Sequence, residues 1–151
     1  MEVRMTAFST IEDLALVTIQ DYKLDKLYRD NPTDWETFIA GYVVRGSLLF
    51  GNSRIDLSYD LNTLSFNADL TNDEIVILVN LFVQMWLERV QFNLSRLGAT
   101  MTPSDAKRTS IYSMIKEQQE LIDRTREKNS QLMTEYGRNS VDWDNWGNGI
   151  F

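Results

Sequence analysis

One long apolar segment, residues 70–98, constrains this chain most strongly; it reads LTNDEIVILVNLFVQMWLERVQFNLSRLG. Thr71 and Glu74 have the T-x-x-E spacing of a capping box, which satisfies free amide groups at the start of a helix. Gly98 stands where a glycine would end that helix. Between them, residues 75–87 are apolar on almost every side, and such a helix must be covered on every side. We therefore expect a central buried helix with the other elements packed around it.

Two amide side chains, Asn80 and Gln84, lie one turn apart inside this apolar run. A buried amide without a partner costs about 1–3 kcal/mol. The two amides therefore either bond a neighbouring element or mark a face that meets another subunit, and the sequence leaves both open. The run itself is far shorter than the ~20 apolar residues that span a bilayer, so no membrane segment is expected.

The composition of the chain narrows the possible classes of function. The chain has no cysteine and no histidine, which removes disulfides, thiol catalysis, the commonest general base and the commonest metal ligand. A net charge of −7 makes a phosphate backbone an unfavourable partner. Residues 1–14 lack the basic start and apolar run of a signal peptide. We expect no enzyme, no cofactor, no membrane anchor and no sequence-specific nucleic-acid binding.

The first part of the chain predicts a loose lead-in and then a helix. Residues 1–8 form the lead-in, and Ser9 and Thr10, followed by acidic residues, predict the helix start. The apolar spacing carries this helix to about Tyr22, with an extension or a restart to Tyr28. Asn31-Pro32 then breaks it.

A second helix is expected up to Gly51, followed by a β-hairpin. Thr33 and Glu36 have capping-box spacing at the helix start. Gly41 and Gly46 lie inside the helical pattern, where they indicate either close approach of another helix or simple tolerance. Residues 53–70 then alternate apolar and polar with the period of two strands. A two-stranded hairpin is marginal alone, so it needs a helix to lie on or a strand from a neighbouring subunit.

The last helix is expected from about Thr109 or Ser110 to Tyr136, with Gly137 as its end. Its middle, residues 123–131, is polar on every face. We therefore expect this helix to pack at both ends and to be exposed in between.

The carboxylates around the predicted hairpin do not indicate a metal site. Their spacing does not match a calcium-binding EF-hand loop. They are more simply explained as solvent-facing strand residues and helix caps; they are Asp56, Asp60, Asp69, Asp73 and Glu74.

The C-terminal segment, residues 138–151, combines a polar, glycine-containing sequence with large apolar side chains. Such side chains, tryptophan above all, commonly anchor protein interfaces. We predict an extended docking tail; the alternative is a tail that folds back on its own domain. The predicted partner-binding residues are Val141, Trp143, Trp146, Ile150 and Phe151.

The expected fold is therefore mainly α: a helical bundle around a central buried helix. Residues 1–137 form the bundle, with a small β-hairpin at about 53–70, and residues 138–151 form the extended tail. The alternative to a structural role, on these patterns alone, is a soluble helical adaptor or regulatory protein that binds a partner through its last helix.

Several stretches carry a family resemblance. They are IQDYKLDKLY at 19–28, the F-x-x-x-Y-V-V helix from Phe38, SYDLNTLSFNADLTNDE at 58–74, Met85-Trp86-Leu87, and SDAKRTS at 104–110. In this order the segments resemble small neck or connector proteins of tailed bacteriophages; related tail and tail-terminator proteins stay open as alternatives. The resemblance implies a non-enzymatic structural protein of the virion, located in the neck at the head–tail junction and assembled in the host cytoplasm. It also implies a homo-oligomeric ring whose partners are the portal and other neck or tail proteins, with C-terminal segments docked on the portal or on neighbouring subunits.

Overall fold

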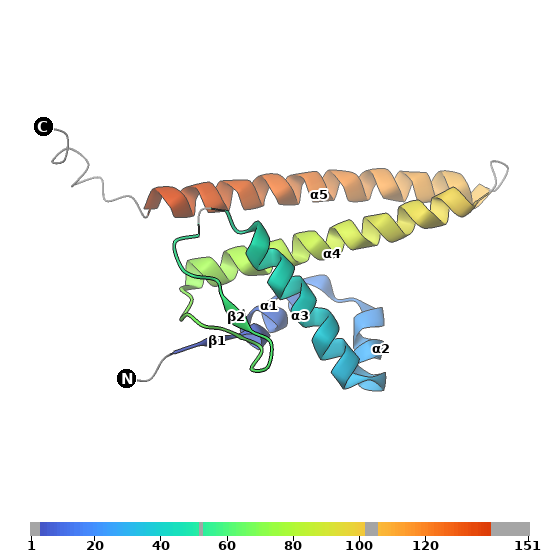
Figure 1. Ribbon diagram of the computed structural model, residues 1–151. Coiled ribbons are helices and arrows are strands. Elements are labelled where there is room, and N and C mark those ends of the chain that lie inside the picture. Colours follow the sequence, from blue (N-terminus) through green and yellow to red (C-terminus); the bar gives the residue numbers. More distant parts are fainter. Residues whose placement is uncertain (1–3, 52, 102–105, 140–151) are drawn as a thin grey trace, which may run out of the picture.

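The computed structural model describes residues 4–51, 53–101 and 106–139. The described chain is mainly helical and carries a small three-stranded antiparallel sheet (Figure 1), which confirms the predicted fold class. The helices are α1 (Phe8–Ile19), α2 (Tyr22–Asp30), α3 (Pro32–Leu49), α4 (Asn72–Thr100) and α5 (Ala106–Asn139), and the strands are β1 (Thr6–Ala7), β2 (Tyr59–Asp60) and β3 (Ser65–Phe66).

Helix α4 is the central element, as predicted. The capping box is formed: the Thr71 hydroxyl accepts from the Glu74 amide at 3.4 Å, and the Glu74 carboxylate accepts from the Thr71 amide at 2.7 Å. Helices α1, α3 and α5 pack against α4. By length and composition alone α4 could cross a membrane. Because core helices of soluble domains pass the same test, and three helices pack on α4, we interpret it as the core helix. Its most deeply buried side chains are Ile77, Leu78, Leu81 and Phe82.

The predicted helix end at Gly98 is wrong. Helix α4 continues through Gly98 to Thr100, and the residue that caps it is Met101. Gly98 is buried, and a Cβ built on it would lie 3.3 Å from the Ile111 Cγ2 of α5. The glycine therefore allows α5 to approach closely, and it does not end the helix.

Helices α4 and α5 form a long antiparallel hairpin whose far end projects beyond α1–α3 (Figure 1). We call residues 90–100 and 106–121 the arm. Just before the arm, Arg89 still contacts α3: its guanidinium lies 4.3 Å from the centre of the Phe38 ring and donates to the Tyr42 hydroxyl at 3.0 Å. Within the arm, Phe92 is 61% exposed. The expectation that α4 is covered on every side therefore fails for its second half, and in its first half Val76 is also exposed.

The N-terminal residues are more ordered than the predicted lead-in. Thr6–Ala7 form β1, which pairs with β3 in the register Thr6 with Phe66 and Ala7 with Ser65. The Thr6 hydroxyl also accepts from the Leu70 amide at 2.8 Å. A two-residue strand has no measurable periodicity, which explains why the sequence pattern missed it.

The predicted hairpin exists but is much shorter than residues 53–70. Strands β2 and β3 pair Tyr59 with Phe66 and Asp60 with Ser65. The sheet order is β1-β3-β2, so the strand that supports the hairpin comes from the same chain.

Of the extension and the restart that the sequence left open, the structure shows a restart, and the first helix ends at Ile19 rather than at about Tyr22. Two capping assignments are also corrected. Helix α1 begins at Phe8 without a side-chain cap. Its end is capped by Gln20, which has a left-handed φ of 48°, and Asp21 then caps α2 by accepting from the Lys23 amide at 2.8 Å. Helix α3 is capped by Asn31 with Pro32 in the first turn, and the Thr33–Glu36 capping box does not form. Proline at that position is pre-shaped for a helix start, which moves the start ahead of Thr33.

The two glycines of α3 have different surroundings. A Cβ on Gly46 would lie 3.5 Å from the Leu81 Cβ and 3.6 Å from the Phe82 amide nitrogen of α4, whereas a Cβ on Gly41 would meet nothing within 4 Å. The close-approach interpretation is therefore confirmed for Gly46, and simple tolerance explains Gly41.

Candidate partner-binding surfaces

The predicted anchors of the tail lie outside the described residues. These anchors are Val141, Trp143, Trp146, Ile150 and Phe151. The first two residues of the predicted tail, Arg138 and Asn139, belong to the last turn of α5. The described structure therefore fixes the point from which the tail departs.

That departure point is fastened to the start of α4. The Tyr136 hydroxyl donates to the Glu74 carboxylate at 2.7 Å, and the Tyr136 ring meets Phe50 edge-on with 5.3 Å between ring centres. Burial, followed by the hydrogen bond to Glu74, raises the pKa of Tyr136 above its ordinary value. The phenol therefore stays a donor, and Glu74 serves both as the helix cap and as the anchor of α5.

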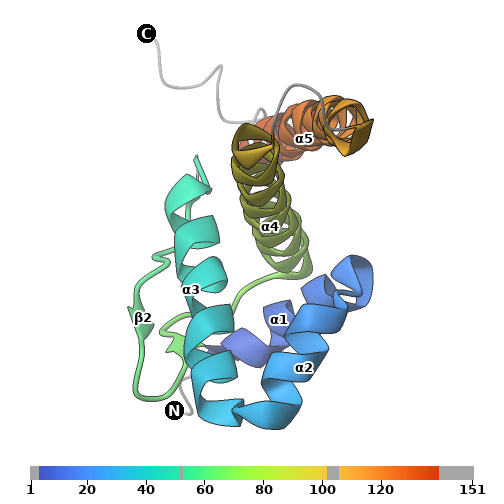
Figure 2. The same ribbon diagram turned by 90° about the vertical axis from the view of Figure 1, so that its right-hand side faces the viewer.

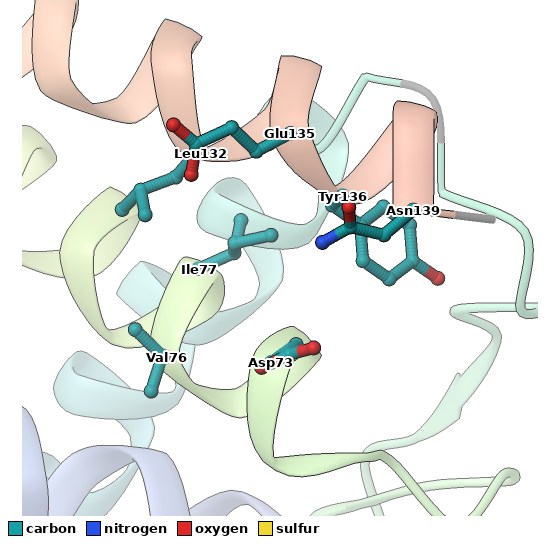
Figure 3. Close-up of a pocket in the computed structure, with 7 residues that line it drawn as sticks. All are labelled: Asp73, Val76, Ile77, Leu132, Glu135, Tyr136 and Asn139. Atoms are coloured by element: carbon teal, nitrogen blue, oxygen red, sulfur yellow. The ribbon is translucent and has the colours of Figure 1, made fainter.

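A small hollow lies beside this junction (Figure 3). Ile77 and Leu132 form its apolar wall, and the carboxylates of Asp73 and Glu135 lie on opposite sides of it. Its volume of about 130 Å³ is well below the roughly 300–1,000 Å³ of small-molecule pockets. The hollow suits a single small side chain better than a metabolite.

Asn80 and Gln84 lie where α4 meets α5. The Gln84 side-chain oxygen accepts from the Asn129 amide nitrogen at 2.8 Å, and the Asn80 backbone oxygen accepts from the same group at 3.3 Å. The Asn80 side chain donates to the Val76 carbonyl at 2.8 Å. The Gln84 side chain therefore bonds the neighbouring helix α5, whereas the Asn80 side chain bonds its own helix α4.

Asn129 is the residue that sequence reasoning missed. It is 2% exposed, although it belongs to the polar stretch 123–131 that was expected to be exposed. Its spacing gives the missing signal, since Ile122, Asn129 and Tyr136 are separated by seven residues each. That heptad spacing is typical of helices packed side by side.

A charged group extends this polar contact toward the arm. Two guanidinium nitrogens of Arg126 donate to one Glu88 oxygen at 3.0 and 2.9 Å, and Gln84 donates to the same oxygen at 3.1 Å. Arg126 and Glu88 are partly exposed, so their attraction is worth less than about 1 kcal/mol. Its main effect is to fix the register of α4 against α5.

The arm presents several large apolar side chains to solvent from both of its helices. Single exposed apolar residues are ordinary, but a narrow two-helix projection has no second layer to cover them. The exposed set is Phe92, Leu97, Tyr112, Met114 and Leu121. The arm is therefore the second candidate contact surface.

Two of the carboxylates near the hairpin cap turns, and Asp56 lies outside the strands, although the sequence suggested solvent-facing strand residues. Asp56 accepts from the Ser58 amide at 3.0 Å, and Asp60 accepts from the Asn62 amide at 2.8 Å. Both are local turn caps. Within the described residues no group of three or more acidic, histidine or cysteine side chains is placed to hold a metal ion.

Comparison of the chain with protein-family models, with curated proteins and with solved structures gave no match.

Proposed function

We propose that this protein is a structural protein of a tailed-phage virion. It forms a ring at the head–tail junction and docks on the portal or on neighbouring subunits through its C-terminal tail. Two observations support the proposal: the segments that resemble neck proteins, and a mainly helical fold of the kind the resemblance implies.

The observation that carries the proposal is the position of the two contact surfaces at opposite ends of α5. The arm with its exposed apolar side chains is at the start of α5, and the tail departs from its end (Figure 1). The 34 residues of α5 rise about 50 Å at 1.5 Å per residue. A subunit with contacts this far apart suits a protein that joins neighbours at one level and a different partner at another.

In the proposed mechanism each contact between subunits or partners is weak, and the ring makes the total binding tight. Once one subunit has docked, the others are held at high effective concentration near equivalent sites. The apolar arm supplies contacts between copies, and the tail supplies the contact to the portal.

Deleting residues 141–151 tests the role of the tail. We expect an unchanged circular dichroism spectrum, because Asn139 and the Tyr136–Glu74 bond are retained, and loss of capture by a portal protein of the same phage. In the full-length protein, Trp143→Ala and Trp146→Ala should each weaken docking by about 2 kcal/mol, whereas Asn145→Ala should change it little. Undiminished binding by the double tryptophan variant would refute the tail as the anchor.

Substitutions on the arm test the ring. Met114→Ser with Leu121→Ser should reduce the oligomer seen by light scattering on a sizing column. The matched control, Val17→Ser with Leu48→Ser, removes two exposed apolar side chains outside the arm and should leave the oligomer intact. Equal effects of the two pairs would contradict the assignment of the arm.

The alternative, an adaptor that binds a partner through its last helix, is favoured by the exposed Met114 and Leu121 of α5. It predicts a monomer or dimer that is captured by a host protein. A ring, or an oligomer that forms only with the portal, excludes this alternative.

A further inference from the structure

A groove on the opposite side of the molecule from α5 carries an unusual concentration of negative charge. It lies between α1, α2 and the start of α3, which form the lower part of the molecule in Figure 2. Its volume is about 460 Å³, within the range of ligand-sized cavities. Five carboxylates line it: Glu12, Asp13, Asp21, Asp25 and Glu36.

The charges on α2 are sorted between its faces. Asp25 and Tyr28, with the capping residue Asp21, follow helical spacing and line the groove, whereas Lys23 and Lys26 are outside the lining. The described lining contains no basic residue. Within the part of the chain that the structure describes, none of the five carboxylates forms an ion pair. The groove is therefore a region of uncompensated negative charge.

Glu12 gives an independent indication of a missing partner. Its side chain is 6% exposed, and its Oε1 atom is fully buried without a hydrogen-bond partner among the described residues. A buried carboxylate oxygen without a donor is costly. Burial, followed by the neighbouring Asp13 and Glu36 carboxylates, raises the pKa of Glu12 to about 7. A positively charged group in the groove would offset the repulsion among these carboxylates.

The remaining walls suit the stem and the face of a long cationic side chain. Leu16 and Leu24 supply apolar surface, and Trp35 packs edge-on against Tyr28 with 5.0 Å between ring centres. Aromatic faces attract guanidinium and ammonium groups. A bare metal ion fits less well, because the carboxylates are spread over three helices and do not converge on one point.

We propose that this groove docks a segment of a partner protein that inserts an arginine or lysine side chain beside Glu12. The partner is basic, because the chain itself carries a net charge of −7 and the groove attracts the opposite sign. The site is separate from the arm and the tail, so it adds a third contact surface to the two described above. Its test does not depend on whether the proposed function is correct.

The test uses the full-length ¹⁵N-labelled protein and the peptide Ac-Ala-Arg-Leu-Arg-Ala-NH2. Its control is the same peptide with citrulline, which keeps the shape of arginine but lacks the charge. We expect saturable chemical-shift changes confined to the groove, including the Trp35 indole N–H, and at least about tenfold weaker binding of the citrulline peptide. Equal binding of both peptides, or shifts centred on α5, would overturn the proposal. Spermidine binding as tightly as the peptide would show that the groove takes small polycations instead.

Paired variants distinguish binding of the peptide at this groove from general electrostatic attraction of the peptide to an acidic protein. Asp25→Asn with Glu36→Gln should weaken binding of the arginine peptide about tenfold, whereas Glu117→Gln with Glu127→Gln, on exposed positions of α5, removes the same charge and should change binding less than about twofold. Equal weakening by both pairs would refute the site. Should the first pair not fold, Glu12→Gln alone is expected to weaken binding at least about threefold, and unchanged binding would refute the proposal.

Discussion

Replacing Glu12 by glutamine tests whether the protein holds this carboxyl in an environment that disfavours its charge. Burial, followed by Asp13 and Glu36, raises the Glu12 pKa from 4.5 to about 7. At 1.36 kcal/mol for each pKa unit, a shift of this size corresponds to roughly 3 kcal/mol. Water in the adjoining groove screens part of it, so we expect about 2 kcal/mol.

The sign follows from where the proton is bound. Between pH 4.5 and 7 the folded protein holds a proton on Glu12 that the unfolded chain has released, so the free energy of unfolding falls as the pH rises through this window. Glutamine carries no charge and removes this contribution. Glu12→Gln should therefore match the parent protein below pH 4.5 and exceed its free energy of unfolding by about 2 kcal/mol at pH 8.

Urea unfolding followed by circular dichroism at intervals from pH 4 to pH 8 measures this difference. Glu127→Gln, at an exposed position of α5, is the matched control and should give a nearly constant difference across the range. A Glu12→Gln variant that is less stable than the parent at pH 8, or a difference independent of pH, would refute the reasoning.

Five further substitutions test three other features by the free energy of unfolding. Gly41→Ala should raise the free energy of unfolding by about 1 kcal/mol, because alanine favours a helix and no atom lies within 4 Å of the added Cβ. Gly46→Ala should raise it by less, since the added Cβ meets α4 at van der Waals distance. A large loss of stability at either position would contradict the packing described. Gln20→Gly should raise the free energy of unfolding by about 0.5–1 kcal/mol, because glycine adopts the left-handed backbone of this position without strain. Gln131→Gly, inside α5, should lower it by about 1 kcal/mol. Effects of the same sign would contradict this explanation. Asn129→Ala should cost about 1–3 kcal/mol, and a neutral result would mean that this amide bond is not structural.

The features that could be predicted from the sequence are those decided by neighbouring residues. The capping box at Thr71 and the break at Asn31-Pro32 both depend on a side chain and a backbone group a few residues away. Such contacts leave a fixed spacing in the sequence. The helical fold class follows from the same local patterns.

Two helix starts were misread from local signals, but other features that were missed or misread depend on residues distant in sequence. Gly98 has the composition of a helix end, and only the approach of Ile111 shows its actual role. From the sequence alone Asn129 looks solvent-exposed, because its bond to Gln84 forms only when α5 packs against α4. The acidic groove is likewise invisible in the sequence, because its carboxylates come together only when α2 turns back beside α3.

The bond from the Leu70 amide to Thr6 makes residues 6–70 a closed loop that contains α1, α2, α3 and the whole sheet. Helix α5 lies outside this loop, so it can separate from α4 without opening it. Proteins open in such cooperative units, each with its own free energy. We expect the backbone amides of α5 to exchange with deuterium at a lower opening free energy than those of α1 and β3. A protein built this way can move its outer helix while its closed loop stays folded.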